Sequence, residues 1–266
     1  MMATFSAPQT TNSLDAARVY ERYIALNSLA AECMGGTMGG RLILYGNVDE
    51  HGAASAVAGN IAGATTLGIS PDKEALKQAI RNGVCDFMVN SLDEALRILK
   101  NEIRKKQAVS VCLGQRFDQA MREIATRGVQ PDILALTSQE WDASAVETTL
   151  LLQRGAVKLP LPQAGVSSQR VGVHWGVANF PALWLPKVDA VAAEVLGDEL
   201  RCRWLRLAPR YLGRRAHSLR YVEMAVDEIE SFIRVVRKML EEGLLETAVT
   251  VQFGGREERL APMTEI

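Results

Sequence analysis

The chain lacks the features that define several large classes of protein. No apolar run approaches the roughly 18 residues of a transmembrane helix, and the N-terminal MMATFSAPQTTNS lacks the basic and apolar regions of a secretory signal. Only four cysteines occur, without CxxC spacing, and the three histidines form no recognisable zinc motif or Ser/His/Asp arrangement. These absences predict a cytoplasmic protein with free thiols, no bound metal and no membrane segment.

The chain also lacks an excess of charge of either sign. Lys and Arg together number 30 and Asp and Glu 31, for a net charge of −1. The composition therefore gives no reason to expect nucleic acid or an anionic membrane as a partner. A hydrophobic fraction of 48% over 266 residues is enough to bury the core of one large domain or two modest ones.

The most informative stretch runs from Gly35 to Ala64. A glycine-rich approach leads into the apolar run 42–45, a turn of Gly, Asn and Asp follows, and small residues begin a helix near Ala53. The order strand, tight turn, helix opens a dinucleotide-binding βαβ unit. The turn, however, contains Asp49 and Glu50, and two carboxylates would repel a pyrophosphate. The architecture therefore favours a nucleotide while the chemistry of the loop opposes one.

Strands and helices alternate beyond this stretch. Apolar runs predict strands over 41–45, 87–89, 108–113 and 131–136, and helical periodicity with capping residues predicts helices over 14–31, 53–67, 73–81, 91–106, 117–127 and 145–154. This alternation predicts an α/β fold in which residues 38–142 form a parallel, Rossmann-like sheet with helices on both faces. A loop rich in Pro, Gly and Ser follows over 159–170, and then helices over 189–196, 200–211 and 221–242 and a last strand over 247–253.

Several words of the sequence, taken in order, resemble one family. They are GGTMGGRLILYG and AGNIAGA, SLDEALRIL, AVSVCLG, ATRGVQPDI, the pair Thr137-Ser138, GVANF, RWLRLA and LEEGLLETAVTVQFGGRE. Together they are similar to urocanase, the urocanate hydratase of histidine breakdown, over most of residues 30–257. The resemblance depends on these segments occurring in the same order as in the family, rather than on any single segment.

The resemblance implies a Rossmann-like domain that binds NAD, whose nicotinamide ring acts as an electrophile toward urocanate. The positions that match the family's cofactor site are Gly46, Asn47, Gly52, Ala53, Ser70, Gly114, Gln115, Thr137 and Ser138. Arg220 matches the cation for the substrate carboxylate, and no catalytic residue can be assigned. The implied organisation is a tail and helix over 1–37, the Rossmann-like domain over 38–220, and a segment over 221–266 that returns to a small mixed α/β remnant of the family's core domain. Most of that core domain is expected to lie outside this sequence.

The sequence departs from the family at its loops. Of residues 47–53 only Gly52 matches the family's glycine-rich turn, and Ser70 stands where an acidic residue would hold ribose hydroxyls. Gln115-Arg116 replaces a pair of small residues, and the histidine that follows the family's TSA is absent, because Thr137-Ser138 is followed here by Gln139-Glu140-Trp141. These departures predict weak NAD binding or none.

Other candidate ligand-binding residues have a functional and a structural interpretation. His51 either contacts a ligand or is a solvated turn residue, and His174, beside Trp175, either faces a pocket or is a structural histidine. The pair Asp49-Glu50 is only a weak signal for a cation. A dense basic block either captures an anion or forms a solvated, ion-paired helix face; it comprises Arg201, Arg203, Arg206, Arg210, Arg214, Arg215 and Arg220.

Two hypotheses for function follow. The first is a urocanase-like hydro-lyase, diverged and inefficient or inactive on urocanate. The second is a non-catalytic Rossmann-like subunit that binds a small ligand or has a regulatory role. In either case the apolar face expected on 221–242 predicts a homodimer or a larger oligomer.

Overall fold

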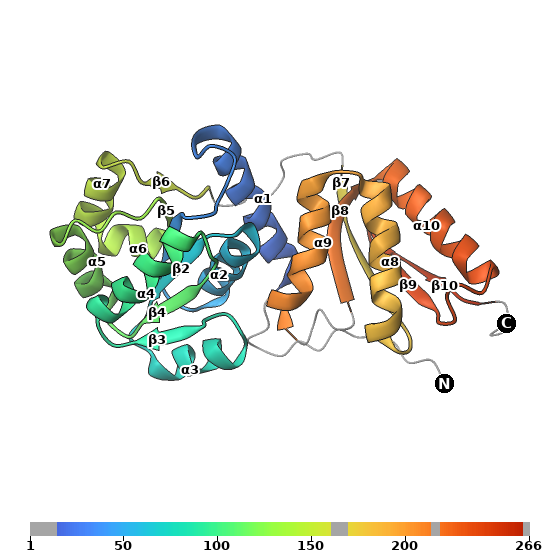
Figure 1. Cartoon of the computed structure of the whole chain (residues 1–266), viewed down its shortest axis with the longest axis horizontal. Coiled ribbons are helices and arrows are strands. Elements are labelled where there is room, and N and C mark those ends of the chain that lie inside the picture. Colours follow the sequence, from blue (N-terminus) through green and yellow to red (C-terminus); the bar gives the residue numbers. More distant parts are fainter. Residues whose placement is uncertain (1–14, 161–169, 214–218, 263–266) are drawn as a thin grey trace.

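The computed structural model describes residues 15–160, 170–213 and 219–262 and divides them between two sheets (Figure 1). A six-stranded sheet has the order β3-β4-β2-β1-β5-β6, and every pair in it is parallel. A four-stranded antiparallel sheet has the order β10-β9-β7-β8. The expected N-terminal tail and most of the expected loop over 159–170 lie outside the described residues.

Residues 16–158 build the parallel half. Its strands are β1 (Leu42–Tyr45), β2 (Thr65–Ile69), β3 (Phe87–Val89), β4 (Ser110–Leu113), β5 (Ile133–Ala135) and β6 (Val157–Lys158). Its helices are α1 (Ala16–Cys33), α2 (Glu50–Ala62), α3 (Lys73–Arg81), α4 (Leu92–Lys105), α5 (Phe117–Thr126), α6 (Ser138–Ala143) and α7 (Ala145–Gln153). The predicted Rossmann-like parallel sheet is therefore confirmed.

Alternation along β1 explains why helices cover both faces. Ile43 and Tyr45 enter one apolar cluster with α1, α2 and α3, whereas Leu42 and Leu44 enter a second with α4, α5 and α7. Successive strand residues point to opposite faces, and a strand buried on both faces is a continuous apolar run. The small residues of α2 allow close packing: a Cβ at Gly59 would lie 2.8 Å from the Thr66 methyl group.

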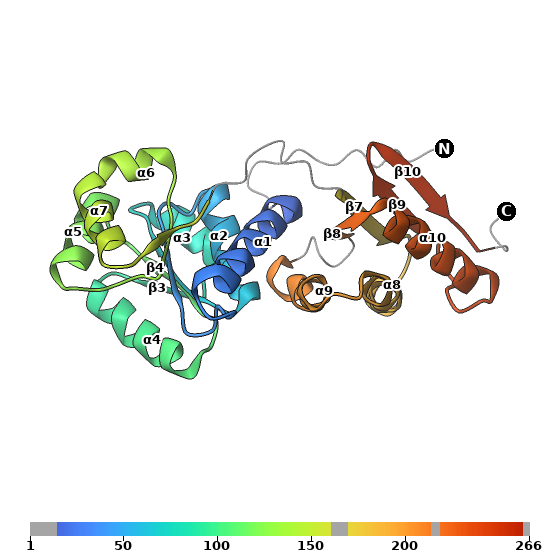
Figure 2. The same ribbon diagram turned by 90° about the horizontal axis from the view of Figure 1, so that it is seen from above.

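Residues 170–260 build the antiparallel half. It comprises β7 (Arg170–Val177), α8 (Pro181–Leu196), α9 (Glu199–Tyr211), β8 (Leu219–Ala225), α10 (Val226–Glu241), β9 (Val249–Phe253) and β10 (Arg256–Leu260). Seen from above, α8 and α9 lie together on one side of the sheet, and α10 lies nearer β9 and β10 (Figure 2). The expected boundary after residue 220 falls inside β8.

Two expectations about this half were wrong. The first part of the predicted helix 221–242 is strand β8, in which Val222 and Met224 are fully buried while Glu223 between them is half-buried. Antiparallel pairing with β7 defines this strand, and the helix begins only at Val226, where the Glu228 carboxylate accepts the Ala225 N–H at 2.8 Å. The strand over 249–253 is not the last, because β10 returns antiparallel to it.

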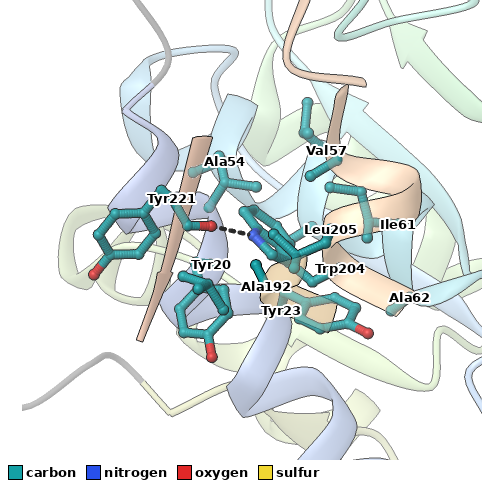
Figure 3. Packing of buried hydrophobic residues seen from close by; sticks show 14 of the residues in the cluster. Tyr20, Tyr23, Ala54, Val57, Ile61, Ala62, Ala192, Trp204, Leu205 and Tyr221 are labelled. Carbon is teal, nitrogen blue, oxygen red and sulfur yellow. Dashed lines mark hydrogen bonds between the residues drawn. The ribbon is translucent and has the colours of Figure 1, made fainter. Parts of the chain in front are cut away.

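The two halves share one apolar cluster (Figure 3). Trp204 of α9 packs edge-on against Tyr20 of α1 at 5.1 Å between ring centroids, and its Nε1 donates to the Tyr221 carbonyl at 2.6 Å. The Tyr23 hydroxyl donates to the Leu200 carbonyl at 2.9 Å, and Arg203 Nη2 donates to the Ala62 carbonyl at the end of α2 at 3.0 Å. Buried aromatic rings with satisfied polar atoms therefore fix one half on the other.

Candidate functional site

The carboxyl ends of β1 and β5 form the topological switch point of the parallel sheet. From β1 the chain continues to β2 on one side, and it later returns to β5 on the other side of β1. In open α/β sheets ligands bind in the crevice at such a point. The loop 46–49 follows β1 and leads into α2, and residues 136 and 137 follow β5 and lead into α6.

The N-terminus of α2, which would face a pyrophosphate, is capped by the chain itself. Asp49 Oδ1 accepts the N–H groups of His51 and Gly52, both at 2.9 Å. Those amides are the donors that a phosphate would use. The next acidic residue, Glu50, pairs with Arg18 at 3.1 Å. A carboxylate therefore already occupies the positive end of the helix.

A second carboxylate fills the crevice between β1 and β5. Glu140 of α6 is only 7% exposed, and its Oε1 accepts the Asn47 N–H at 2.8 Å while its Oε2 accepts the Thr137 N–H at 2.8 Å. A Cβ placed on Gly46 would lie 1.7 Å from Glu140 Oε1, so the carboxylate lies directly on that glycine. The glycine that would let a ligand approach the backbone instead makes room for a side chain of the protein.

These contacts test whether a dinucleotide fits. The backbone donors of the β1–α2 turn and of the β5–α6 turn are engaged by Asp49 and Glu140. A phosphate placed there would meet two carboxylates and no free donor among these groups, and like charges close together in a partly buried site repel by several kcal/mol. The residues present do not fit NAD.

The predicted cofactor positions do gather at the carboxyl edge. Ser70 follows β2, and its N–H donates to the Leu113 carbonyl of β4 at 3.1 Å. Gly114 N–H donates to the Val89 carbonyl of β3 at 2.8 Å, and the Gln115 Oε1 is buried without a hydrogen-bond partner among the described residues. The other predicted positions lie on the same edge, in the turns after β1 and β5 or in the first turns of α2 and α6. They are Gly46, Asn47, Gly52, Ala53, Thr137 and Ser138. NAD contact by any of them stays a prediction.

Arg220 lies elsewhere, on β8 of the antiparallel half. Its Nε donates to Asp189 Oδ2 of α8 at 2.7 Å, and the Trp175 Nε1 donates to the other carboxylate oxygen at 3.0 Å. Burial raises the pKa of Asp189, and the Arg220 guanidinium opposes that rise. This arginine is therefore held by a partly buried ion pair remote from the carboxyl edge.

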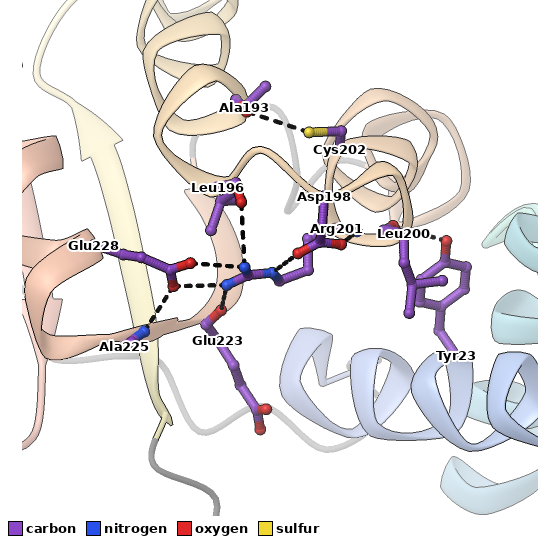
Figure 4. Close-up of polar contacts among 10 residues, drawn as sticks. All are labelled: Tyr23, Ala193, Leu196, Asp198, Leu200, Arg201, Cys202, Glu223, Ala225 and Glu228. Carbon is purple, nitrogen blue, oxygen red and sulfur yellow. Dashed lines mark hydrogen bonds and ion pairs between the residues drawn. The ribbon is translucent and has the colours of Figure 1, made fainter.

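The described arginines of the basic block differ in their burial and in their partners. Arg201, with a side chain 4% exposed, bonds both oxygens of Glu228 at 2.7 Å and also contacts Asp198 and the carbonyls of Glu223 and Leu196 (Figure 4). Arg206 pairs with Glu199 at the surface, and the Arg210 guanidinium lies over the Tyr211 ring. Arg214 and Arg215 lie outside the described residues. Among the described arginines of the block, Arg201 is therefore ion-paired, as the structural interpretation expected, but it is buried rather than solvated.

The remaining candidates do not converge on a site. His51 is exposed at the start of α2, whereas His174 lies in β7 against Tyr221 with ring centroids 4.7 Å apart, where burial lowers its pKa. Within the described residues no three His, Cys, Asp or Glu side chains are arranged to hold a metal, the four cysteines are free, and no helix has the length and apolar character needed to cross a membrane.

From the sequence, Glu140 was named only as part of the run 139–141 that departs from the family, and no contact was predicted for it. The signal was present, because Thr137-Ser138-Gln139-Glu140 has the capping-box pattern in which a glutamate at the third helical position reaches back to the cap N–H. That pattern identifies the Thr137 contact. It does not identify the contact to Asn47, which depends on β5 lying beside β1.

Six parallel strands flanked by helices, with turns meeting at a switch point, define a Rossmann-like α/β domain. Residues 19–141 match the family model of the urocanase Rossmann-like domain. This part of the chain, from within α1 to within α6, is thus similar to that domain, and the switch point closed by Glu140 lies within it.

Proposed function

We propose that this chain is a urocanase homologue that does not act as a urocanate hydratase and functions as a non-catalytic, small-ligand-binding subunit. The observation that carries the proposal is the buried Glu140 carboxylate, bonded to the Asn47 and Thr137 N–H groups at the switch point. Both hydrogen bonds are partly buried and have a charged acceptor, and displacing the carboxylate would break two such bonds, each worth about 1.5–3 kcal/mol.

The family's reaction supplies the second line of support. As the resemblance implies, urocanate hydration needs a bound NAD ring as electrophile and a cation for the substrate carboxylate. Here the carboxylates of Asp49 and Glu140 oppose the binding of NAD. Arg220, the candidate cation for the substrate carboxylate, pairs with Asp189 instead. Groups that act as a unit lose most of the rate when one fails.

We further propose that the chain acts in the cytoplasm and self-associates as a homodimer or a larger oligomer. Large apolar side chains that remain exposed in the antiparallel half support self-association; they include Phe180, Leu183, Leu219 and Leu244. Light scattering at micromolar concentration would contradict this part of the proposal if it gave a monomer of 29.1 kDa.

The decisive assay follows the ultraviolet absorbance of urocanate with the purified protein, with and without added NAD. We expect a flat trace under both conditions, alongside a known urocanase as a positive control. Turnover within the usual enzymatic range of roughly 1–1000 per second would overturn the proposal. Activity only with added NAD would show that the Glu140 contact opens in solution.

A further inference from the structure

A groove with a volume of about 890 Å³ runs along α10 in the antiparallel half. Its opposite wall is formed by β9, the glycine turn at Gly254, and β10, and the start of β7 contributes Val171. The volume lies in the range of about 300–1,000 Å³ that is typical of small-molecule sites. The elements that line the groove, α10, β9, β10 and β7, belong to the antiparallel half, and the carboxyl edge of the parallel sheet lies in the other half (Figure 1).

Apolar side chains gather at the end of the groove where β8 passes into α10. Ile229 and Ile233 of α10 are buried beneath it, and Phe253 contributes from the end of β9. Val171 and Val226 in the same lining remain 37% and 62% exposed. An apolar ligand placed here would remove these two valines from water, which is favourable by about 25 cal/mol per Å² buried.

The cations of the groove fall into two groups. Arg237 forms an ion pair with Glu258 that joins α10 to β10, and Lys238 lies 3.7 Å from Glu242. Arg234 and Arg256, in contrast, make no ion pair or side-chain hydrogen bond with any other described residue, and both are exposed. Each wall of the groove therefore carries one arginine without a partner among the described residues: Arg234 on the helix and Arg256 on the hairpin.

Two acids also line the groove without an ion-pair partner among the described residues, Glu230 and Glu241. Glu241 lies seven residues beyond Arg234, about 10 Å along the helix axis, so it belongs to the end away from Val226. The apolar end thus has two unpaired guanidinium groups against one unpaired carboxylate, a local excess of positive charge.

We propose that this groove binds a small amphiphilic carboxylate, with its apolar body on Val171, Val226 and Phe253 and its anionic head between Arg234 and Arg256. Guanidinium groups suit this role because their planar array of donors matches a carboxylate. The inference rests on the proposed ligand-binding function and gives that function a site and a ligand class. It also moves the expected anion-binding arginines away from the basic block at Arg201–Arg220, where Arg201 and Arg220 already have carboxylate partners.

Isothermal titration with octanoate tests the proposal, with octan-1-ol and octylammonium as chemical controls. Octanoate should bind more tightly than both, because the alcohol lacks the charge and the amine reverses it. Arg234→Met and Arg256→Met should each weaken octanoate binding by about tenfold, the effect of losing one charge-assisted hydrogen bond. Arg210→Met removes an exposed guanidinium from α9 and should leave binding unchanged.

Equal affinity for octanoate and octan-1-ol, or unaltered affinity in the Arg234→Met, Arg256→Met double variant, would overturn the site. So would a dimer that excludes octanoate and dissociates on Arg234→Glu substitution, since a second copy would then occupy the groove. Circular dichroism of each variant distinguishes lost binding from lost folding. The urocanate assay is independent: turnover there would refute the proposed function, whereas a failed titration refutes only this site.

Discussion

The two halves of the molecule use their charged side chains in opposite ways. In the parallel half, carboxylates close the ligand edge: Asp49 caps α2, and Glu140 bonds the turns after β1 and β5. In the antiparallel half, Arg201 is enclosed by carboxylates and carbonyls, yet Arg234 and Arg256 stand on an open groove without an ion-pair partner among the described residues. In the parallel half, carboxylates of the protein accept hydrogen bonds from the backbone N–H groups of His51, Gly52, Asn47 and Thr137 at the switch point. In the antiparallel half, the guanidinium groups of Arg234 and Arg256 remain available to a ligand.

The comparison of the two halves predicts that substitution of Arg201 causes the largest loss of folding stability. Arg201→Met should reduce the free energy of unfolding by about 3–5 kcal/mol, because it leaves the Glu228 carboxylate and the carbonyls without their donor. Urea denaturation measures the change. Arg206→Met is the matched control on the same helix; its surface pair with Glu199 should contribute at most about 1 kcal/mol. Equal losses in the two variants would contradict the role given to burial.

A smaller loss is expected at Glu140. Glu140→Ala leaves the Asn47 and Thr137 N–H groups without their acceptor, and we expect a loss of about 1–3 kcal/mol. Glu32→Ala, at an exposed position of α1, should change stability by no more than about 0.5 kcal/mol. If the Glu140 variant unfolds at the same urea concentration as the Glu32 variant, the carboxylate is not a structural part of the crevice.

The smallest effect is a pH dependence in the antiparallel half. Hydrogen bonds from Arg201 hold the pKa of Glu228 below its ordinary value of 4.5. The ionised pair therefore contributes stability that is fully present above that ordinary value and is lost as pH falls through the lower folded pKa. Melting temperatures of the wild type should fall over this acidic window, and those of Glu228→Gln should fall less steeply. Parallel curves would remove Glu228 from the acid response.

Much of the parallel half could be predicted from sequence because its signals are local. Buried apolar strands such as 108–113, and helices begun by Asp72 or Ser91, have patterns that neighbouring residues complete. The antiparallel half was harder. The stretch 221–242 has apolar residues at helical spacing throughout, and its first residues form a strand because β7 is available to pair with them. Non-local pairing overrides local preference there.

The candidate site divides along the same line. The segments that resemble urocanase predicted Asn47 and Thr137 at the carboxyl edge of the sheet. The turns that contain them meet because β1 and β5 are neighbours in the sheet. The acidic loop at Asp49 indicated opposition to phosphate. The contact from Glu140 to Asn47 joins residues 93 positions apart and could not be predicted from either segment. The groove at Arg234 and Arg256 likewise requires the β9–β10 hairpin, which was not predicted, to lie beside the predicted helix.

The central claim, that the switch point is closed to a dinucleotide by Asp49 and Glu140, is tested most directly by the NAD content of the purified protein. The protein is denatured, and the released nucleotide is quantified by chromatography and compared with protein concentration; NAD is then titrated into untreated protein by calorimetry. We predict no released NAD and no saturable heat. Release of NAD in stoichiometric amounts, or saturable binding of added NAD by the untreated protein, would contradict the account.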